Sequence, residues 1–222
     1  MPETLDGPRW GPAEGGAPRK LVLLLHGLGA DGFDLIDLAP GWGKAVPNAL
    51  FVAPHAPEPC DMAPFGRQWF SVQDRTPARM LAGVRVAADH LSAFLNAETA
   101  RHGLAAGDVA LMGFSQGAMT ALFTGLRRDP PPAAILAYSG RLVGAEVLQA
   151  ELRGRPPVLL VHGESDDVVP VSGSREAEAA LTALGIPVES AYRTGLAHGL
   201  DDAGIALGGL MLQRHLGGMT GA

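Results

Sequence analysis

The sequence predicts an α/β domain in which helices cover both faces of a mostly parallel sheet. A length of 222 residues suits one large domain, and a composition of 47% apolar and 18% charged residues suits a buried core. From Lys20 onward, short apolar runs alternate with longer segments of helical period, a pattern typical of parallel strands joined by crossover helices. We therefore expect one domain over residues 20–218, preceded by an irregular arm over 1–19 that is rich in Pro, Gly and Glu.

The predicted strands are short runs, most of them continuously apolar. Such runs are expected when helices bury a strand on both faces, whereas a sheet with one wet face shows alternation. The runs cover residues 21–25, 50–53, 109–113, 134–138, 157–161 and 188–192.

The clearest predicted helix covers residues 77–101. Thr76 is placed as its N-cap, Pro77 at its first position and Gly103 just past its end. Its apolar residues recur every three or four positions, which predicts one buried face. Further helices are expected over 116–128, 172–184 and 203–215, and residues 54–76 form a long loop of the kind that often carries function.

Charge and cysteine content exclude several classes of protein. The 17 Lys and Arg against 23 Asp and Glu give a net charge of −6, and no basic run exceeds Arg127-Arg128, so nucleic acid is not an expected partner. Cys60 is the single cysteine, which excludes an intrachain disulfide and a cysteine-based zinc site and fits a reducing compartment. Without a recognisable targeting peptide or a run long enough to cross a bilayer, we expect a cytoplasmic protein with no stable membrane association.

The strongest chemical signal is the GxSxG pattern at residues 113–117. It lies between an apolar run and a helical segment beginning near Gln116, where a sharp turn would project the Ser115 hydroxyl away from the sheet. The two glycines remove side chains that would collide there, and the helix dipole points at the place where an oxyanion would form. With 30 glycines in the chain, an ordinary glycine-rich turn is the alternative; the flanking segments favour a nucleophile.

A serine nucleophile needs a base and a carboxylate that orients the base. An acidic loop, HGESDDVVP at 162–170, follows one predicted strand, and His198 follows the next, so the order is Ser, Asp, His with one acid near residue 166. His162 precedes the position expected for the base and is assigned to shaping the acidic loop. No pair of ligands has metal-binding spacing such as HExxH, so neither a metal nor another cofactor is expected.

A second oxyanion donor is expected from the glycine-rich loop LHGLGADG at 25–32. We place the backbone N–H of Leu28 there, with the N–H of Gln116 as its partner, and assign His26 a structural role. Phosphate binding is the alternative for such a loop. However, GLGADG is not the GxGxxG pattern of nucleotide-binding loops, and no acidic residue that could serve as its partner stands at the end of a second predicted strand.

Taken together, these segments resemble the phospholipase/carboxylesterase family of small bacterial carboxylesterases and acyl-protein thioesterases. The shared landmarks run in order along the chain: LHGLGADG, PHAP at 54–57, Trp69-Phe70, GFSQGA at 113–118, YSGRL at 138–142, HGESDDVVP and His198-Gly199. The resemblance implies a compact α/β-hydrolase fold without a large cap, Asp166 rather than Asp167 as the acid, and His198 as the base. The family often has a second glycine where this chain has Ala118, a departure expected to affect helix packing more than chemistry.

The resemblance implies hydrolysis of carboxylic esters through an acyl-enzyme on Ser115, and small soluble esters are the expected substrates. Phe65, Trp69 and Leu200 are expected to line the pocket, with Trp69 as one wall beside Leu28. A lysophospholipase or acyl-protein thioesterase with a longer apolar groove is the alternative. A catalytically silent binding protein on the same scaffold is a further one, against which the intact Ser, Asp and His argue. A homodimer is left open.

Overall fold

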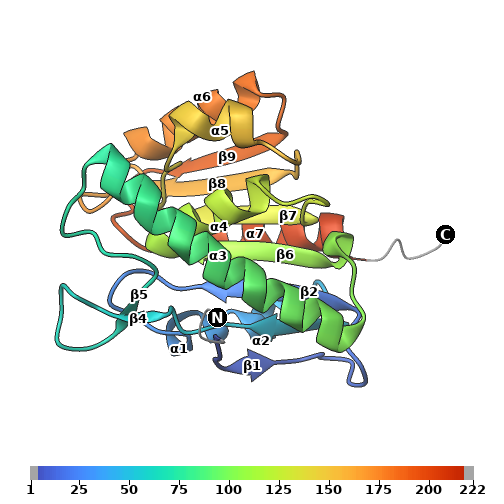
Figure 1. Ribbon diagram of the computed structural model, residues 1–222. Coiled ribbons are helices and arrows are strands. Elements are labelled where there is room, and N and C mark those ends of the chain that lie inside the picture. Colours follow the sequence, from blue (N-terminus) through green and yellow to red (C-terminus); the bar gives the residue numbers. More distant parts are fainter. Residues whose placement is uncertain (1–4, 218–222) are drawn as a thin grey trace.

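A seven-stranded sheet forms the centre of the molecule in the computed structural model, which describes residues 5–217 (Figure 1). Residues 1–4 of the expected arm and the expected domain end at residue 218 lie outside this range. The strand order is β1-β3-β2-β6-β7-β8-β9, with β1 antiparallel to β3 and all other neighbours parallel. The strands are β1 Arg9–Trp10, β2 Lys20–Leu25, β3 Ala49–Val52, β6 Val109–Phe114, β7 Ala134–Tyr138, β8 Val158–Gly163 and β9 Val188–Arg193.

The predicted α/β architecture is confirmed, and each of the six predicted strands has a counterpart in the sheet. Strand β9 contains polar residues among apolar ones and is only partly buried, because it lies at the edge of the sheet. Strand β1 was not expected: Arg9 and Trp10 pair with β3, and the Arg9 guanidinium donates a hydrogen bond of 3.1 Å to the buried Glu98 carboxylate. Two residues are too few to show a strand period. The short strands β4 Glu58–Pro59 and β5 Arg67–Gln68 form a separate hairpin in the long loop.

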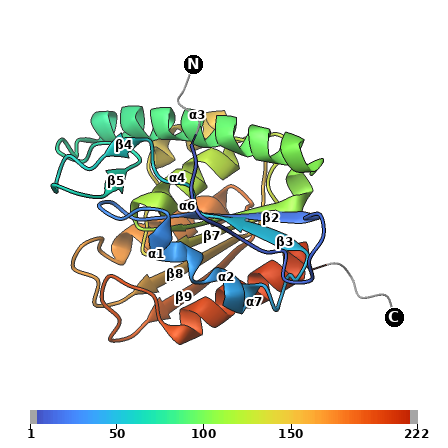
Figure 2. The same ribbon diagram turned by 90° about the horizontal axis from the view of Figure 1, so that it is seen from below.

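Helices cover both faces of the sheet (Figure 2). Helices α3 Pro77–His102, α4 Gln116–Leu126, α5 Ala145–Glu151 and α6 Ser172–Ala183 lie on one face, and α1 Phe33–Ile36, α2 Ala39–Trp42 and α7 Asp202–Leu216 lie on the other. A short 3₁₀ helix, η1, covers Ala106–Asp108. Alternate residues of β2 enter two separate core clusters: Leu21, Leu23 and Leu25 face one side, and Val22 and Leu24 face the other. The continuous apolar runs are therefore buried from both faces.

The predicted helix ends lie within a few residues of the observed ones. Gly103 closes α3 with φ +66°, in the left-handed region that glycine adopts without strain. Thr76 occupies the N-cap position, but its side chain makes no capping bond; its own N–H donates to Asp74 Oδ1 at 2.9 Å. Helices α1, α2 and α5, of four to seven residues, were not predicted because they are too short to show a helical period.

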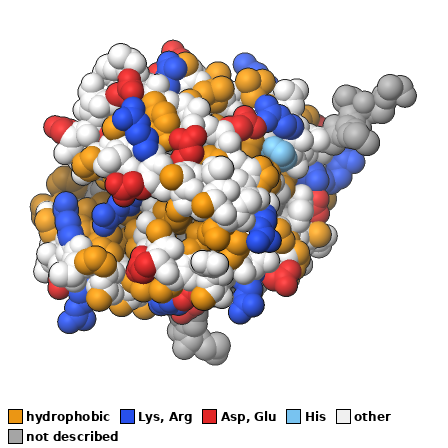
Figure 3. Space-filling view, turned by 90° about the horizontal axis from the view of Figure 1, so that it is seen from above, with side chains coloured by type: hydrophobic (Ala, Val, Ile, Leu, Met, Phe, Trp, Pro, Cys, Tyr) orange, Lys and Arg blue, Asp and Glu red, His pale blue; other side chains and the backbone are white. Residues whose placement is uncertain are grey.

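The face that α5 and α6 form carries charges of both signs, interspersed with apolar and neutral atoms (Figure 3). No helix within residues 5–217 is both long and apolar enough to cross a membrane. In that same part of the chain, no three His, Cys, Asp or Glu side chains are grouped to hold a metal ion. No cap domain is inserted between the elements of the described core.

Candidate active site

Ser115 occupies a strained turn between a strand and a helix. Strand β6 ends at Phe114 and α4 begins at Gln116, so Ser115 alone makes the change of direction, with φ 54° and ψ −116°. A positive φ is uncommon for a residue other than glycine, and such strain clusters at functional sites. The Ser115 N–H donates to the Tyr138 carbonyl at 2.8 Å, which ties the turn to the neighbouring strand β7. The backbone of Ser115 is thus fixed between the end of β6, the start of α4 and the neighbouring β7.

The two glycines of the motif are required by the close packing of this turn. A Cβ at Gly113 would lie 2.3 Å from the backbone of Gly117, and a Cβ at Gly117 would lie 1.9 Å from the Leu25 carbonyl oxygen. Both neighbours are backbone atoms, so neither can move aside as a flexible side chain could. The Ala118 side chain packs against a third glycine, Gly140. A Cβ at Gly140 would lie only 2.6 Å from the Ala118 Cβ.

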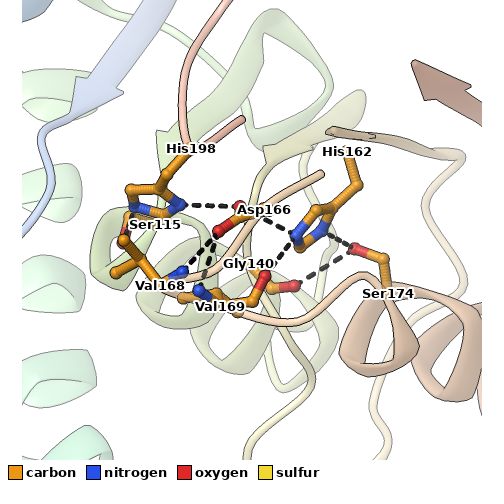
Figure 4. Close-up of polar contacts among 8 residues, drawn as sticks. All are labelled: Ser115, Gly140, His162, Asp166, Val168, Val169, Ser174 and His198. Carbon is orange, nitrogen blue, oxygen red and sulfur yellow. Dashed lines mark hydrogen bonds and ion pairs between the residues drawn. The ribbon is translucent and has the colours of Figure 1, made fainter. Parts of the chain in front are cut away.

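The structure brings Ser115, Asp166 and His198 together from three separate loops (Figure 4). His198 Nε2 lies 3.0 Å from Ser115 Oγ, and His198 Nδ1 lies 2.7 Å from Asp166 Oδ2. A carboxylate beside Nδ1 selects the tautomer with its hydrogen on Nδ1, which leaves the Nε2 lone pair to accept the serine proton. The geometry is that of a nucleophile, a base and a group that orients the base.

The Asp166 carboxylate is buried and heavily hydrogen-bonded. Its Oδ1 atom accepts the N–H groups of Val168 at 3.0 Å and Val169 at 2.9 Å, while Oδ2 faces His198. Burial raises the pKa of Asp166, but the hydrogen bonds from His198 and the two backbone amides outweigh burial and hold the pKa below its ordinary value. Asp166 is therefore ionised at neutral pH. The neighbouring Asp167 is exposed.

The loops that carry Asp166 and His198 are bonded to each other. The Glu164 N–H donates to the Arg193 carbonyl at 2.9 Å, and the Ser165 N–H donates to the Leu196 carbonyl at 3.0 Å. A Cβ at Gly163 would lie 2.2 Å from that same Leu196 oxygen, so only glycine permits this approach. These contacts hold the loop of the acid against the loop of the histidine.

Two contacts of the histidine loop were missed by the sequence reasoning. The Phe114 ring packs against the His198 ring with centroids 4.9 Å apart and an interplanar angle of 46°. The Arg193 Nε atom donates to Asp201 Oδ2 at 2.9 Å, and these residues flank the turn that carries His198. Phe114 precedes the nucleophile in the motif, which is the one signal that could have marked it.

The glycine-rich loop after β2 is held by the long loop that follows β3. The Gly29 N–H donates to the Arg67 carbonyl at 2.9 Å, and the Arg67 N–H donates to the Ala30 carbonyl at 2.8 Å. A Cβ at Gly66 would lie 1.9 Å from the Gly29 carbonyl oxygen, so the two backbones touch. The Arg67 guanidinium in turn bonds the carbonyl of Pro57 at 2.7 Å. The sequence carried no signal for this role of Arg67.

The two expected oxyanion donors lie on these supported segments. Within residues 5–217, neither the Leu28 N–H nor the Gln116 N–H donates to another protein group. The Gln116 side chain is buried and fixes the start of α4: its Oε1 accepts the Trp69 N–H at 2.8 Å, and its Nε2 donates to the Phe70 carbonyl at 2.7 Å. Their place in an oxyanion hole stays a prediction.

The burial of Trp69 argues against its expected role as a wall of an open pocket. Trp69 is 1% exposed and belongs to the core cluster between the sheet and α3, and its indole N–H donates to the His26 carbonyl at 2.9 Å. An aromatic residue in a long loop is typical of a pocket, but this loop folds back and buries it. Phe65 is 74% exposed, and Leu200 packs half-buried beside the core cluster of α7. The pocket roles of Phe65 and Leu200 stay predictions.

His26 is buried and supports the same loop. Its Nδ1 lies 2.7 Å from the Gly27 carbonyl oxygen and its Nε2 accepts the Ala56 N–H at 3.0 Å, so the hydrogen sits on Nδ1. Burial is the main cause that lowers the pKa of His26 to about 4. The residue is a neutral structural histidine at pH 7.

The fold and this site define an α/β-hydrolase with a Ser-His-Asp arrangement on a strand-to-helix turn. Comparison with known proteins agrees with that class. The chain belongs to the phospholipase/carboxylesterase family, whose sequence profile matches residues 13–207.

Several relatives have known names or structures. The esterase YpfH of Escherichia coli (strain K12) is 30% identical over 190 residues, which cover 83% of this chain and 78% of that protein. The crystal structure of esterase PE8 is similar with a TM-score of 0.91 and 45% identity, covering 96% of this chain and all of the other. The acyl-protein thioesterase 2 of Zea mays shares the fold, with a TM-score of 0.68 and 24% identity over 91% of this chain and 96% of that one.

Proposed function

We propose that this protein hydrolyses short-chain carboxylic esters through an acyl-enzyme on Ser115, with His198 as base and Asp166 as its orienting acid. Family membership and similarity to two esterases make it a carboxylesterase; the proposal adds the residues and the size of the acyl group. The observation that carries it is the continuous hydrogen-bonded path from Ser115 Oγ through His198 to Asp166, with distances of 3.0 and 2.7 Å.

The chemistry follows from these contacts. His198 Nε2 takes the proton of Ser115 as its oxygen attacks the ester carbonyl, and the Leu28 and Gln116 N–H groups stabilise the oxyanion. His198 then gives that proton to the departing alcohol, which leaves an acyl group on Ser115. Water attacks the acyl-enzyme while His198 takes one of its protons; His198 then gives that proton to Ser115 Oγ as the acyl bond breaks, and the carboxylic acid is released. Asp166 stabilises the positive imidazole ring in both halves of the reaction.

A second candidate, hydrolysis of esters or thioesters of longer acyl chains, is favoured by apolar side chains on the loops around the site. Phe33 begins α1 just after the glycine-rich loop and is 65% exposed, Phe65 is 74% exposed, and Val168 in the acidic loop is 58% exposed. Each methylene that such a surface covers contributes about 0.8 kcal/mol, so affinity would grow with chain length.

A series of p-nitrophenyl esters from C2 to C16 separates the two candidates. A maximum of kcat/KM near C4 to C6 supports the short-chain proposal, and a maximum at C12 or longer supports the second candidate.

The nucleophile is tested by Ser115→Ala, which is expected to lower turnover by several orders of magnitude, as removal of a triad member does. A fluorophosphonate should also label the peptide that contains Ser115. Ser139→Ala is the matched control, because Ser139 is also buried and also has a positive φ, of 49°, but lies after β7. A Ser115→Ala variant that keeps more than about a tenth of wild-type activity would refute the assignment.

A further inference from the structure

A second buried histidine lies against the Asp166 carboxylate, on the side away from His198 (Figure 4). His162, in strand β8, is fully buried, and its Nε2 lies 3.1 Å from Asp166 Oδ2. The oxygen that faces His198 therefore also faces His162. The proposed mechanism gives His162 no task.

Both polar neighbours of His162 Nε2 are acceptors. Besides Asp166 Oδ2, the Val169 carbonyl oxygen lies 2.8 Å from this nitrogen. A bare nitrogen would be repelled by two oxygens, one of them ionised, so Nε2 carries a hydrogen. It donates this hydrogen to the Val169 carbonyl, and Asp166 Oδ2 lies beside that bond as a charge contact. Nε2 carries this hydrogen whether or not the other ring nitrogen, Nδ1, is protonated. Nδ1 lies 2.7 Å from Ser174 Oγ, whose hydroxyl can donate either to Nδ1 or to the Gly140 carbonyl 3.1 Å away.

We propose that His162 is a positioning residue that keeps the Asp166 carboxylate in place for His198, through the hydrogen bond of its Nε2–H to the Val169 carbonyl and the close approach of the same group to Asp166 Oδ2. The carboxylate accepts three N–H groups, those of Val168 and Val169 on Oδ1 and that of His198 on Oδ2, and the His162 Nε2 atom lies 3.1 Å from Oδ2 beside them. The bond from His162 to the Val169 carbonyl also holds the turn formed by residues 166–169 in place. The inference rests on the proposed function, since it concerns the group that orients the base.

The geometry sets the direction of the effect on pH dependence. Without His162, the amides still hold Oδ1, but the carboxylate can turn about that oxygen, and the Oδ2 charge is compensated by His198 alone. That charge stabilises the protonated His198 ring more strongly, so the acid limb of activity moves to higher pH. The other charged groups of these loops, Glu164 and the Arg193–Asp201 pair, are unchanged by a substitution at His162.

Two substitutions separate positioning from simple support of the fold. In His162→Gln, the amide nitrogen can stand where Nε2 stands and can donate to the Val169 carbonyl beside Asp166. In His162→Asn, the shorter side chain can reach only the position of Nδ1, beside Ser174. Both variants replace a buried ring by an amide, so urea denaturation is expected to show that both lose stability. If His162 only supported the fold, kcat would fall by similar factors in the two variants.

The expected result is a fall in kcat of at least about 10-fold for His162→Asn on p-nitrophenyl butyrate, with KM little changed. The acid limb of its kcat/KM profile moves to higher pH. His162→Gln keeps kcat within about threefold and leaves the limb in place. Equal losses in the two variants, or an acid limb that stays or moves to lower pH in His162→Asn, would overturn the proposal.

A spectroscopic measurement separates this inference from the proposed function. Long-range ¹H–¹⁵N spectra of the wild-type protein show which ring nitrogens of His162 carry hydrogen, and we expect a hydrogen on Nε2. A bare Nε2 overturns the inference whether or not the protein hydrolyses esters. Full activity in Ser115→Ala would instead refute the proposed function and leave the spectroscopic result standing.

Discussion

Replacing Asp166 by asparagine tests the orientation of the base. The amide oxygen of the variant must occupy the Oδ1 position, because the Val168 and Val169 N–H groups, at 3.0 and 2.9 Å, need an acceptor there. The amide NH₂ then faces His198 Nδ1. Two donors cannot bond each other, so His198 moves its hydrogen to Nε2 and can no longer accept the Ser115 proton.

The size of this effect follows from the tautomer. A wrong histidine tautomer costs about 10⁴-fold in kcat in serine hydrolases, or about 5 kcal/mol of transition-state stabilisation. One hydrogen bond to a charged group is lost as well, and such a bond contributes about 1.5–3 kcal/mol to stability. Both quantities are measurable on one protein sample, as kcat on p-nitrophenyl butyrate from pH 5 to 9 and as urea denaturation.

Asp167→Asn is the matched control, because Asp167 is adjacent and exposed. We expect its kcat within about threefold of wild type and its stability within about 0.5 kcal/mol. The reverse ordering of the two variants, or a loss below tenfold for Asp166→Asn, would refute the assignment of Asp166 as the orienting acid.

Two further predictions concern the support of the site. Trp69→Ala should lower the free energy of unfolding by about 3–5 kcal/mol in urea denaturation, since the ring is buried, and should leave the preferred acyl length unchanged; a shifted preference would return Trp69 to the pocket. Burial lowers the pKa of His26 to about 4, so between about pH 6.5 and 4 the unfolded chain binds a proton there that the folded protein does not. Stability should therefore fall with decreasing pH by up to about 1.4 kcal/mol per unit in this window, and His26→Gln should lose that contribution; parallel stability curves for the two proteins would contradict it.

The layered α/β fold was readable from the sequence because its signals are local. Burial on both faces makes strands such as β2 and β8 continuously apolar, and the long helix α3 is marked by Pro77 at its start and Gly103 at its end. The turn at Ser115 is likewise encoded within five residues, since Gly113 and Gly117 meet backbone atoms that admit no side chain. Short elements such as β1 and α5 carry too few residues to show a period.

The resemblance, rather than any local pattern, selected Asp166 over Asp167, and the structure places the first against His198 and exposes the second. Burial of Trp69, the clamp of Arg67 on the glycine-rich loop and the approach of His162 to Asp166 were decided by the tertiary structure. Each depends on how loops from distant parts of the chain fold back over the ends of the strands. Such contacts leave no periodic trace in a single sequence, because the packing of the whole domain, and not the neighbouring residues, determines them.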